Sequence, residues 1–144
     1  MIISGARKMK ARIAVFLFAL LLIGCEENSP TNLEVGSYSG DFTVFYDYDS
    51  PEQSSRTGST ILTLDENGYN LTENTSYTPP RSEGKCSWGA IAISFQDTIA
   101  HTLEFDHRLI IGGAYNYSFD GTTLDMSQID SDLNRKYRYI LTKD

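Results

Sequence analysis

Residues 36–48 have the sequence GSYSGDFTVFYDY, and their pattern decides the fold class of this chain. From Tyr38 to Tyr48, every second residue is Tyr, Gly, Phe or Val, while positions 39, 41, 43 and 47 are Ser, Asp, Thr and Asp. Side chains of a β-strand point alternately to opposite faces, so a period of two indicates one apolar and one polar face. The stretch therefore predicts a half-buried β-strand.

Similar strand-like runs follow as far as the C-terminus, separated by turn residues, and no segment has a convincing helical period. Asn67-Gly68 and Asp120-Gly121 each lie between two such runs, and both predict hairpins because these residue types accept positive φ. Residues 96–108 fit either a strand or a turn of helix. The predicted strands after the first are 60–64, 69–72, 84–88, 90–95, 114–119, 122–127 and 135–141.

About eight short strands with hairpin-length connections predict an all-β fold. We expect an antiparallel up-and-down meander that closes into a small barrel, which removes unpaired edges, with an open β-sandwich as the alternative. Inward Tyr, Phe, Leu and Ile side chains would fill most of the interior and leave room for one small ligand at best. The candidate pocket residues are Tyr46, Trp88, Tyr115, Tyr117 and Tyr139. The alternative is that these rings only pack the core and pair across strands.

The N-terminus predicts an export signal. Four basic residues between Arg7 and Arg12 precede the apolar run 13–23, which is shorter than the roughly 20 residues of a membrane-spanning helix. Met9 is an alternative start. We expect a signal peptide over 1–24, a polar tether over 25–35 and a single domain over 36–144.

The sequence Leu22-Ile23-Gly24-Cys25 resembles the lipobox of bacterial lipoproteins. This resemblance implies cleavage before Cys25, lipid on that cysteine, and anchoring in the outer membrane, on either its periplasmic or its cell-surface face. An ordinary secretory signal or a signal anchor is the alternative. Glu26 and Glu27 resemble the acidic pair that marks surface export in some such proteins; otherwise they are part of a solvated tether.

The charge balance narrows the possible partners. The chain of 144 residues has 12 basic and 19 acidic residues; without residues 1–24, eight basic residues remain against nineteen acidic ones, a formal charge of −11. Such a surface does not suit nucleic acid, which needs cations facing phosphates. It keeps the protein soluble or attracts a basic protein partner. With Cys25 lipidated, Cys86 has no intramolecular partner, and we expect it to be buried and inert rather than redox-active or catalytic.

Two turns carry a second resemblance. The segments 64–69 (LDENGY) and 117–124 (YSFDGTTL), together with 36–42 (GSYSGDF), resemble lipocalin-like domains of small secreted bacterial lipoproteins. The resemblance covers most of residues 36–143. It implies a β-barrel that binds a small ligand.

Few residues suggest other chemistry. His101 and His107 lie near Glu104 and Asp106, but their spacing matches no zinc signature, and a packed or solvated loop is favoured over a metal site. No nucleophile or phosphate-loop motif occurs. We therefore expect no metal, no cofactor and no enzyme. Asp97-Thr98-Ile99 resembles a short O-glycosylation motif with Thr98 as acceptor, although so short a match can arise by chance.

These observations lead to two functional expectations. The first is a membrane-anchored, non-catalytic binding module for a small or apolar ligand, a glycan included. The second is an acidic surface interaction protein, either an inhibitor or an accessory subunit, that binds a basic partner.

Overall fold

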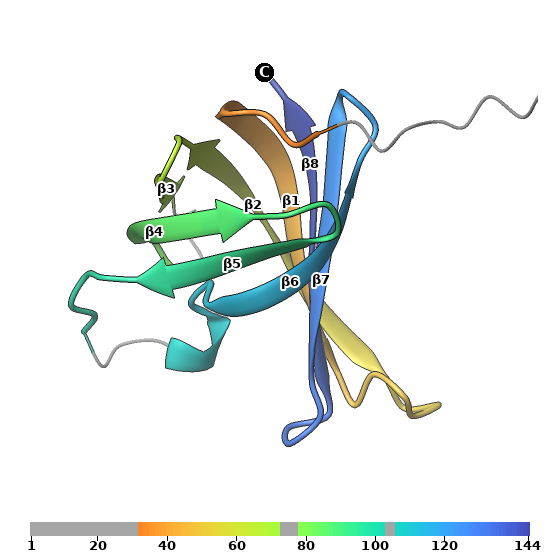
Figure 1. The fold of residues 1–144 in the computed structure, drawn as a ribbon. Helices are drawn as coiled ribbons and strands as arrows, with labels where there is room; N and C mark the ends of the chain where they lie inside the picture. The colour runs from red at the N-terminus through yellow and green to blue at the C-terminus, as the bar shows by residue number, and fades with distance from the viewer. Residues whose placement is uncertain (1–31, 73–77, 103–105) are drawn as a thin grey trace, which may run out of the picture.

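The computed structural model describes residues 32–72, 78–102 and 106–144. Eight antiparallel strands form one closed barrel in simple meander order, so the predicted barrel is confirmed and the open sandwich is wrong (Figure 1). In the part of the chain that the structure describes, no helix is long and apolar enough to cross a membrane. The elements are β1 (Gly36–Tyr46), β2 (Ser54–Leu64), β3 (Gly68–Thr72), β4 (Ser82–Trp88), β5 (Ala92–Asp97), the 3₁₀ turn η1 (His107–Leu109), β6 (Gly113–Phe119), β7 (Thr123–Asp130) and β8 (Arg135–Lys143).

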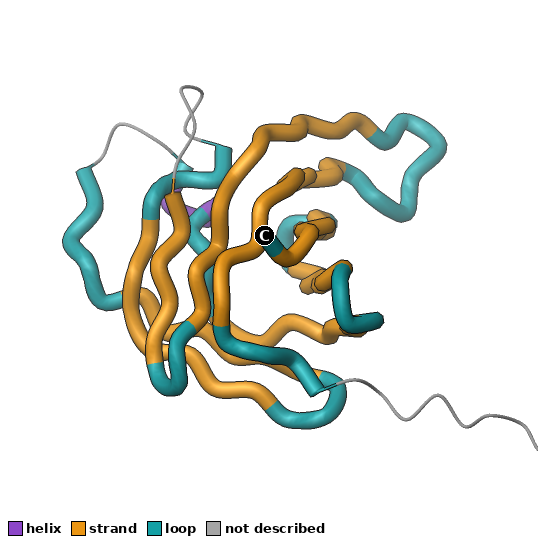
Figure 2. The backbone as a smooth tube through the Cα atoms, turned by 90° about the horizontal axis from the view of Figure 1, so that it is seen from above, coloured by secondary structure: helices purple, strands orange, loops and turns teal. Residues whose placement is uncertain are grey.

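The barrel closes because β1 pairs on both edges. It pairs with β2 from Gly36 to Tyr46 and with β8 from Tyr38 to Tyr46, and Figure 2 shows the resulting ring of strands from above. Gly40 permits this closure: a Cβ atom there would lie 2.2 Å from the carbonyl oxygen of Ile140 on β8. Glycine is therefore required for the backbones to approach so closely.

The first hairpin differs from the prediction. β1 ends at Tyr46 because Asp47 has a φ of 50°, so Tyr48 lies in the turn instead of the strand. β2 begins at Ser54, six residues before the predicted start at 60. Residues 54–59 have no apolar alternation, but each of them pairs with a residue of β1, and this ladder extends the strand.

The turns of the two predicted hairpins are closed by aspartate side chains. Asp65 Oδ1 accepts hydrogen bonds from the backbone N–H groups of Asn67 (3.0 Å) and Gly68 (2.6 Å). Neither Asn67 nor Gly68 has positive φ, so that part of the prediction is wrong although the hairpin itself is confirmed. Asp120 accepts two backbone bonds in the same way, and there Gly121 does have a positive φ of 97°. These local side-chain bonds define the turns.

Residues 96–108, which fitted either a strand or a turn of helix, contain the end of a strand and the start of a helical turn. β5 continues to Asp97, and the Asp106 side chain caps the single turn η1. Leu109 and Ile111 then enter the core, 4 % and 0 % exposed. The segment thus leads from the barrel wall back to its interior.

Inward residues of all eight strands form one continuous core. Leu33 also belongs to it at 4 % exposure, so the end of the predicted tether packs against the barrel. The last strand alternates between the interior and the outside: Tyr137, Tyr139 and Leu141 are buried, while Ile140 is exposed. The largest fully buried side chains are Tyr38, Tyr139, Phe42, Leu62, Leu64, Leu71, Ile93, Ile111, Leu124, Met126, Leu141 and Val44.

Candidate functional site

A chain of aromatic contacts crosses the barrel interior. Tyr69 of β3 contacts Phe95 of β5 with ring centroids 5.0 Å apart, and Phe95 contacts Tyr115 of β6 at 5.8 Å. Tyr115 contacts Tyr139 of β8 at 5.8 Å. Phe42 of β1 completes the chain, at 4.6 Å from Tyr139 and 6.4 Å from Tyr137. Four tyrosines from three sides of the barrel therefore lie within one interior region.

Several hydroxyl groups in this region are buried without a hydrogen bond. Among the described residues, the hydroxyls of Tyr69, Tyr137, Tyr139 and Ser82 are buried without a well-formed hydrogen bond; Tyr69 lies beside the Ser82 hydroxyl and the Asp97 carboxylate, and Tyr137 lies beside the Arg135 guanidinium, whereas Tyr139 has no such partner. Tyr69 and Tyr137 are 4 % exposed, and Tyr139 and Ser82 are fully buried. We call these four residues the hydroxyl cluster. Buried polar groups in proteins are nearly always hydrogen-bonded, so the unpartnered Tyr139 hydroxyl marks this region as a candidate ligand site.

The pKa values of the tyrosines show the same burial. Burial raises the pKa of Tyr69 to about 12, opposed by the nearby Ser82 hydroxyl and assisted by the Asp97 carboxylate. Burial also raises the pKa values of Tyr115, Tyr137 and Tyr139. The phenols influence one another, since a charge on Tyr69 or Tyr115 would raise the pKa of Tyr139 further. All of these hydroxyls are therefore protonated at neutral pH.

No family model, curated protein or solved structure matches this chain. Function must therefore be inferred from the barrel itself.

Two polar side-chain pairs adjoin the hydroxyl cluster. His101 Nε2 lies 2.5 Å from Asp97 Oδ2, and both side chains are mostly buried. The Arg135 guanidinium lies 2.9 Å from Asp106 Oδ2 and stacks over Tyr46 with 4.9 Å to the ring centroid. Burial by itself would raise the pKa of Asp106, but its hydrogen bonds from the Arg108 backbone and from Arg135 lower it overall.

The five predicted pocket residues do not lie in one site. Tyr115 and Tyr139 lie within the aromatic chain, and Tyr46 lies beside Arg135. Trp88 and Tyr117 are bonded elsewhere: the Trp88 indole N–H donates to the Leu33 carbonyl (3.2 Å), and the Tyr117 hydroxyl donates to the Gly89 carbonyl (2.5 Å).

Sequence reasoning missed Tyr69, Tyr137 and Ser82 as members of the site. A signal existed for two of them. Tyr137 shares a strand face with Tyr139, and Tyr69 alternates with Leu71 in β3. Ser82 had no such signal, because it lies where a proline-rich breaker meets β4.

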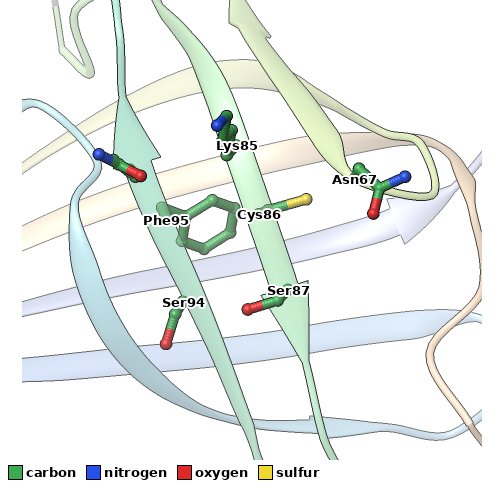
Figure 3. Close-up of a pocket in the computed structure, with 7 residues that line it drawn as sticks. Asn67, Lys85, Cys86, Ser87, Ser94 and Phe95 are labelled. Carbon is green, nitrogen blue, oxygen red and sulfur yellow. The ribbon is translucent and has the colours of Figure 1, made fainter.

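A hollow of about 600 Å³ lies against the β4–β5 hairpin (Figure 3). It is lined by Asn67, Lys85, Cys86, Ser87, Ser94, Phe95 and Gln96. The Cys86 thiol points toward the turn of Asn67 and donates to the Gly68 carbonyl at 2.9 Å. Burial raises the pKa of Cys86 to about 11, with a smaller contribution from Asp65. Cys86 is buried, as expected, and the raised pKa keeps its thiol protonated at neutral pH.

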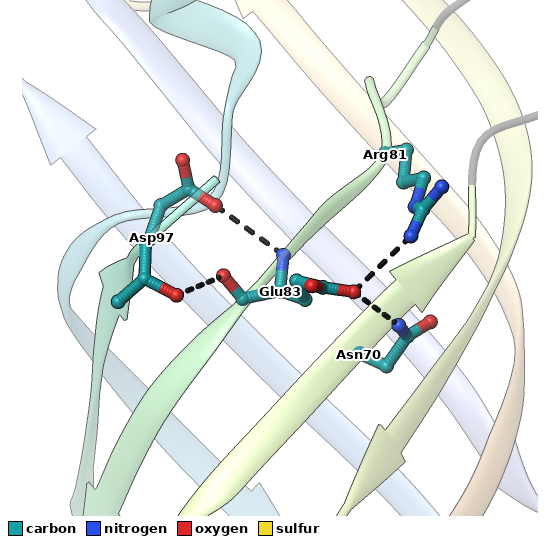
Figure 4. A network of polar contacts seen from close by, with 5 residues as sticks. Asn70, Arg81, Glu83 and Asp97 are labelled. Carbon is teal, nitrogen blue, oxygen red and sulfur yellow. Dashed lines mark hydrogen bonds and ion pairs between the residues drawn. The ribbon is translucent and has the colours of Figure 1, made fainter. Parts of the chain in front are cut away.

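A polar network ties the outer wall of β3, β4 and β5 together (Figure 4). Glu83 Oε2 accepts from Asn70 and from Arg81, each at 3.2 Å, and the Glu83 N–H donates to Asp97. Thr98, the predicted glycosylation site, is exposed, and its hydroxyl donates to the Glu83 carbonyl at 3.2 Å. This network holds the strand ends that carry Ser82 and Asp97.

The remaining predicted site residues contribute no further cluster. His107 contacts the His101 ring with centroids 6.2 Å apart, while Glu104 lies outside the described residues. Within ranges 32–72, 78–102 and 106–144, no group of three or more His, Cys, Asp or Glu side chains could hold a metal ion. Cys25, Glu26 and Glu27 also lie outside the described residues.

Proposed function

We propose that this chain is an exported, lipid-anchored protein whose barrel binds one small ligand in its interior. The hydroxyl cluster is the observation that carries this proposal. A buried hydroxyl without a partner destabilises a fold by about 1–3 kcal/mol, so the Tyr139 hydroxyl is an unrelieved penalty in the free protein. A bound molecule with complementary groups would supply the missing hydrogen bonds.

The chemistry of the cluster favours binding over catalysis. The raised pKa values keep the phenols protonated, so at neutral pH they act as hydrogen-bond donors and not as bases or nucleophiles. The Cys86 thiol is likewise held protonated. We therefore propose a carrier or sensor rather than an enzyme.

The proposed anchor would hold the barrel close to the membrane. Residue 32, the first that the structure describes, lies seven positions after Cys25, and seven steps of extended chain span at most about 25 Å. Two or more acyl chains anchor a protein stably. Cys25→Ser should prevent lipid attachment and release the protein from the membrane fraction. Unchanged fractionation and unchanged signal cleavage would contradict the lipoprotein assignment.

Native mass spectrometry of the full chain, extracted in mild detergent, tests ligand binding directly. We expect a mass increment that disappears on denaturation, or uptake of a molecule from lipid and glycan libraries into stripped protein. If neither occurs for any compound, the binding proposal fails.

A second candidate function rests on an acidic end of the barrel. The β1–β2 and β7–β8 loops lie at the same end of the barrel (Figure 1). Asn134 Nδ2 of the second loop donates to Asp49 Oδ1 of the first at 2.5 Å. These loops and the last residue of β7 carry five carboxylates: Asp47, Asp49, Glu52, Asp130 and Asp132. A basic protein could bind there through charge attraction. Binding of a cationic probe protein such as lysozyme should then weaken with salt and with Asp49→Asn; salt-independent behaviour would contradict it.

A further inference from the structure

We infer that the turn between β4 and β5 contacts the lipid bilayer that holds the proposed anchor, with the Ile91 side chain inserted among the lipids. This inference rests on the lipid attachment proposed for Cys25 and adds which surface of the barrel faces the membrane. We call residues 88–91 (WGAI) the hairpin tip. Three features of the tip support the inference: its apolar exposure, the bonding of its polar groups, and its position beside the tether.

The hairpin tip presents a large apolar side chain to solvent. Ile91 is 73 % exposed, more than any other large hydrophobic residue that the structure describes. Gly89 and Ala90 are exposed as well. The sequence has no charged residue from Cys86 to Gln96. The tip can therefore leave water without the large cost of desolvating a charge of its own.

Several polar groups of the hairpin tip are bonded within the protein. The Trp88 indole N–H donates to the Leu33 carbonyl at 3.2 Å, and the Tyr117 hydroxyl donates to the Gly89 carbonyl at 2.5 Å. The Ile91 carbonyl accepts the Tyr117 N–H at 2.9 Å. These groups would lose little on contact with lipid, because their hydrogen bonds do not depend on water. Trp88 and Tyr117 are also the ring types that suit a boundary between an apolar and an aqueous phase.

The hairpin tip lies beside the point where the tether enters the barrel. The bond from Trp88 to Leu33 joins the tip to the second residue that the structure describes. Val35, which is 49 % exposed, follows two positions later. The lipid on Cys25 would be separated from residue 32 by at most about 25 Å of extended chain. The tether therefore keeps this part of the barrel close to the bilayer.

Other exposed isoleucines are less suited to contact with lipid. Ile129 is 54 % exposed, but it lies near the end of β7 that leads into the β7–β8 loop, and that loop and residue 32 are at opposite ends of the barrel in Figure 1. Ile140 is 44 % exposed, but its register partners are Asp41 and Asp125, whose carboxylates would have to leave water with it. Ile91 has neither disadvantage.

The expected strength of the contact suits an anchored protein. At the exposed fraction of Ile91, transfer of the side chain from water to lipid favours contact about tenfold. Such a preference does not bind a protein from solution, since even one myristoyl chain binds a bilayer only marginally. Once the anchor is inserted, the second contact is intramolecular, and a tenfold preference suffices to orient the barrel. The hairpin tip thus adds to the anchor and does not replace it.

Fluorescence of Trp88 tests the inference, because it is the only tryptophan in the sequence and belongs to the hairpin tip. The full chain is produced in a bacterium that attaches the lipid and is reconstituted into phosphatidylcholine vesicles with ordinary or brominated acyl chains. Bromine quenches only indoles close to it, and flotation of the protein with the vesicles reports the anchor. We expect bromine to lower the emission about twofold, since a side chain inserted about 5–10 Å brings the indole to the acyl boundary. Added salt should not change this apolar contact.

Variants identify the side chain responsible. Ile91→Asp removes the apolar gain and adds the cost of burying a carboxylate, so the quenching should fall at least about fivefold. Ile91→Ser is the second variant if Ile91→Asp folds poorly, and it should also lower the quenching. Ile129→Asp is the matched control, because it makes the same change at an exposed isoleucine far from the tether; its quenching should equal that of the unmodified chain.

The outcomes separate this inference from the proposed anchor. A chain that floats with the vesicles but shows no quenching, or shows equal quenching after Ile91→Asp, would overturn the inference and leave the anchor intact. Equal loss in Ile129→Asp would overturn it too. Absence of quenching together with a dimer that Ile91→Asp dissociates, measured by sedimentation, would assign the tip to a second copy of the chain instead. If the full chain does not float with the vesicles, the anchor is refuted, and this inference with it.

Discussion

Removing the Tyr139 hydroxyl should stabilise the free protein. Tyr139 is fully buried, and its hydroxyl has no partner among the described residues. Tyr139→Phe keeps the ring that contacts Phe42 at 4.6 Å and Tyr115 at 5.8 Å. Only the desolvated oxygen is lost, and an unsatisfied buried hydroxyl is unfavourable by about 1–3 kcal/mol. We expect the free energy of unfolding to rise by at least about 1 kcal/mol.

Tyr38→Phe supplies the opposite result within the same barrel. Its hydroxyl donates to the Glu34 carbonyl, and loss of such a hydrogen bond typically lowers stability by about 0.5–1.5 kcal/mol. The two variants change the same atom in equally buried residues, so the difference between them isolates hydrogen-bond satisfaction. It should be about 2 kcal/mol, or a separation in Tm of the order of 8 °C for a domain of this size.

Chemical denaturation of the full chain, stripped of ligand by refolding, measures these changes. Trp88 is the only tryptophan and is partly buried beside the core, so its fluorescence reports unfolding. Circular dichroism provides the second probe needed to establish a two-state transition. If Tyr139→Phe lowers stability as much as Tyr38→Phe does, the Tyr139 hydroxyl has a partner such as a trapped water, and the reasoning from an unsatisfied cluster is refuted.

Three further predictions concern the barrel. Gly40→Ala should lower the unfolding free energy by about 1–3 kcal/mol, because its Cβ would collide with the Ile140 carbonyl oxygen; unchanged denaturant midpoints would contradict that close approach. The unfolding free energy should fall as pH rises from about 9 to 12. Burial raises the pKa of Cys86 to about 11 and that of Tyr69 to about 12, so the unfolded chain loses these protons at lower pH than the folded one. An unfolding free energy that does not change over this pH range in denaturant titrations would contradict this. Asp65→Ala should lower the unfolding free energy by about 1 kcal/mol, because it removes two turn hydrogen bonds. Asp65→Asn retains an acceptor oxygen and should lower it less; equal losses in the two variants would contradict this role of Asp65.

The sequence predicts strand faces well because alternation is a local property. Tyr38, Phe42 and Val44 are fully buried, as the period of two indicates. The start of β2 could not be predicted, because Ser54 and its neighbours join a strand only through their pairing with β1. The backbone of the β2–β3 turn also depended on a side-chain bond from Asp65 that the Asn-Gly signal does not reveal.

The site is less predictable than the fold for a physical reason. Tyr115 and Tyr139 could be placed inside the barrel from their alternation. Whether their neighbours include Tyr69 depends on contacts between β3, β5 and β6 through the interior, which a linear pattern does not contain. Whether a buried hydroxyl has a hydrogen-bond partner is harder still to predict from the sequence, because it depends on the position of individual oxygen atoms.

The geometry of a barrel explains why some tyrosine hydroxyls have a hydrogen-bond partner and the Tyr139 hydroxyl has none. Tyr38 and Tyr117 reach the carbonyl groups of Glu34 and Gly89, which lie outside the strands. Tyr139 is the central residue of β8, and around it the backbone carbonyls form ladder hydrogen bonds that run along the barrel wall. Such carbonyls do not point into the interior, so the wall has no backbone acceptor to offer a hydroxyl there. A phenol at mid-barrel can thus be hydrogen-bonded only by another side chain or by a molecule held inside, and the Phe42 ring, whose centroid lies 4.6 Å from that of Tyr139, provides no oxygen acceptor.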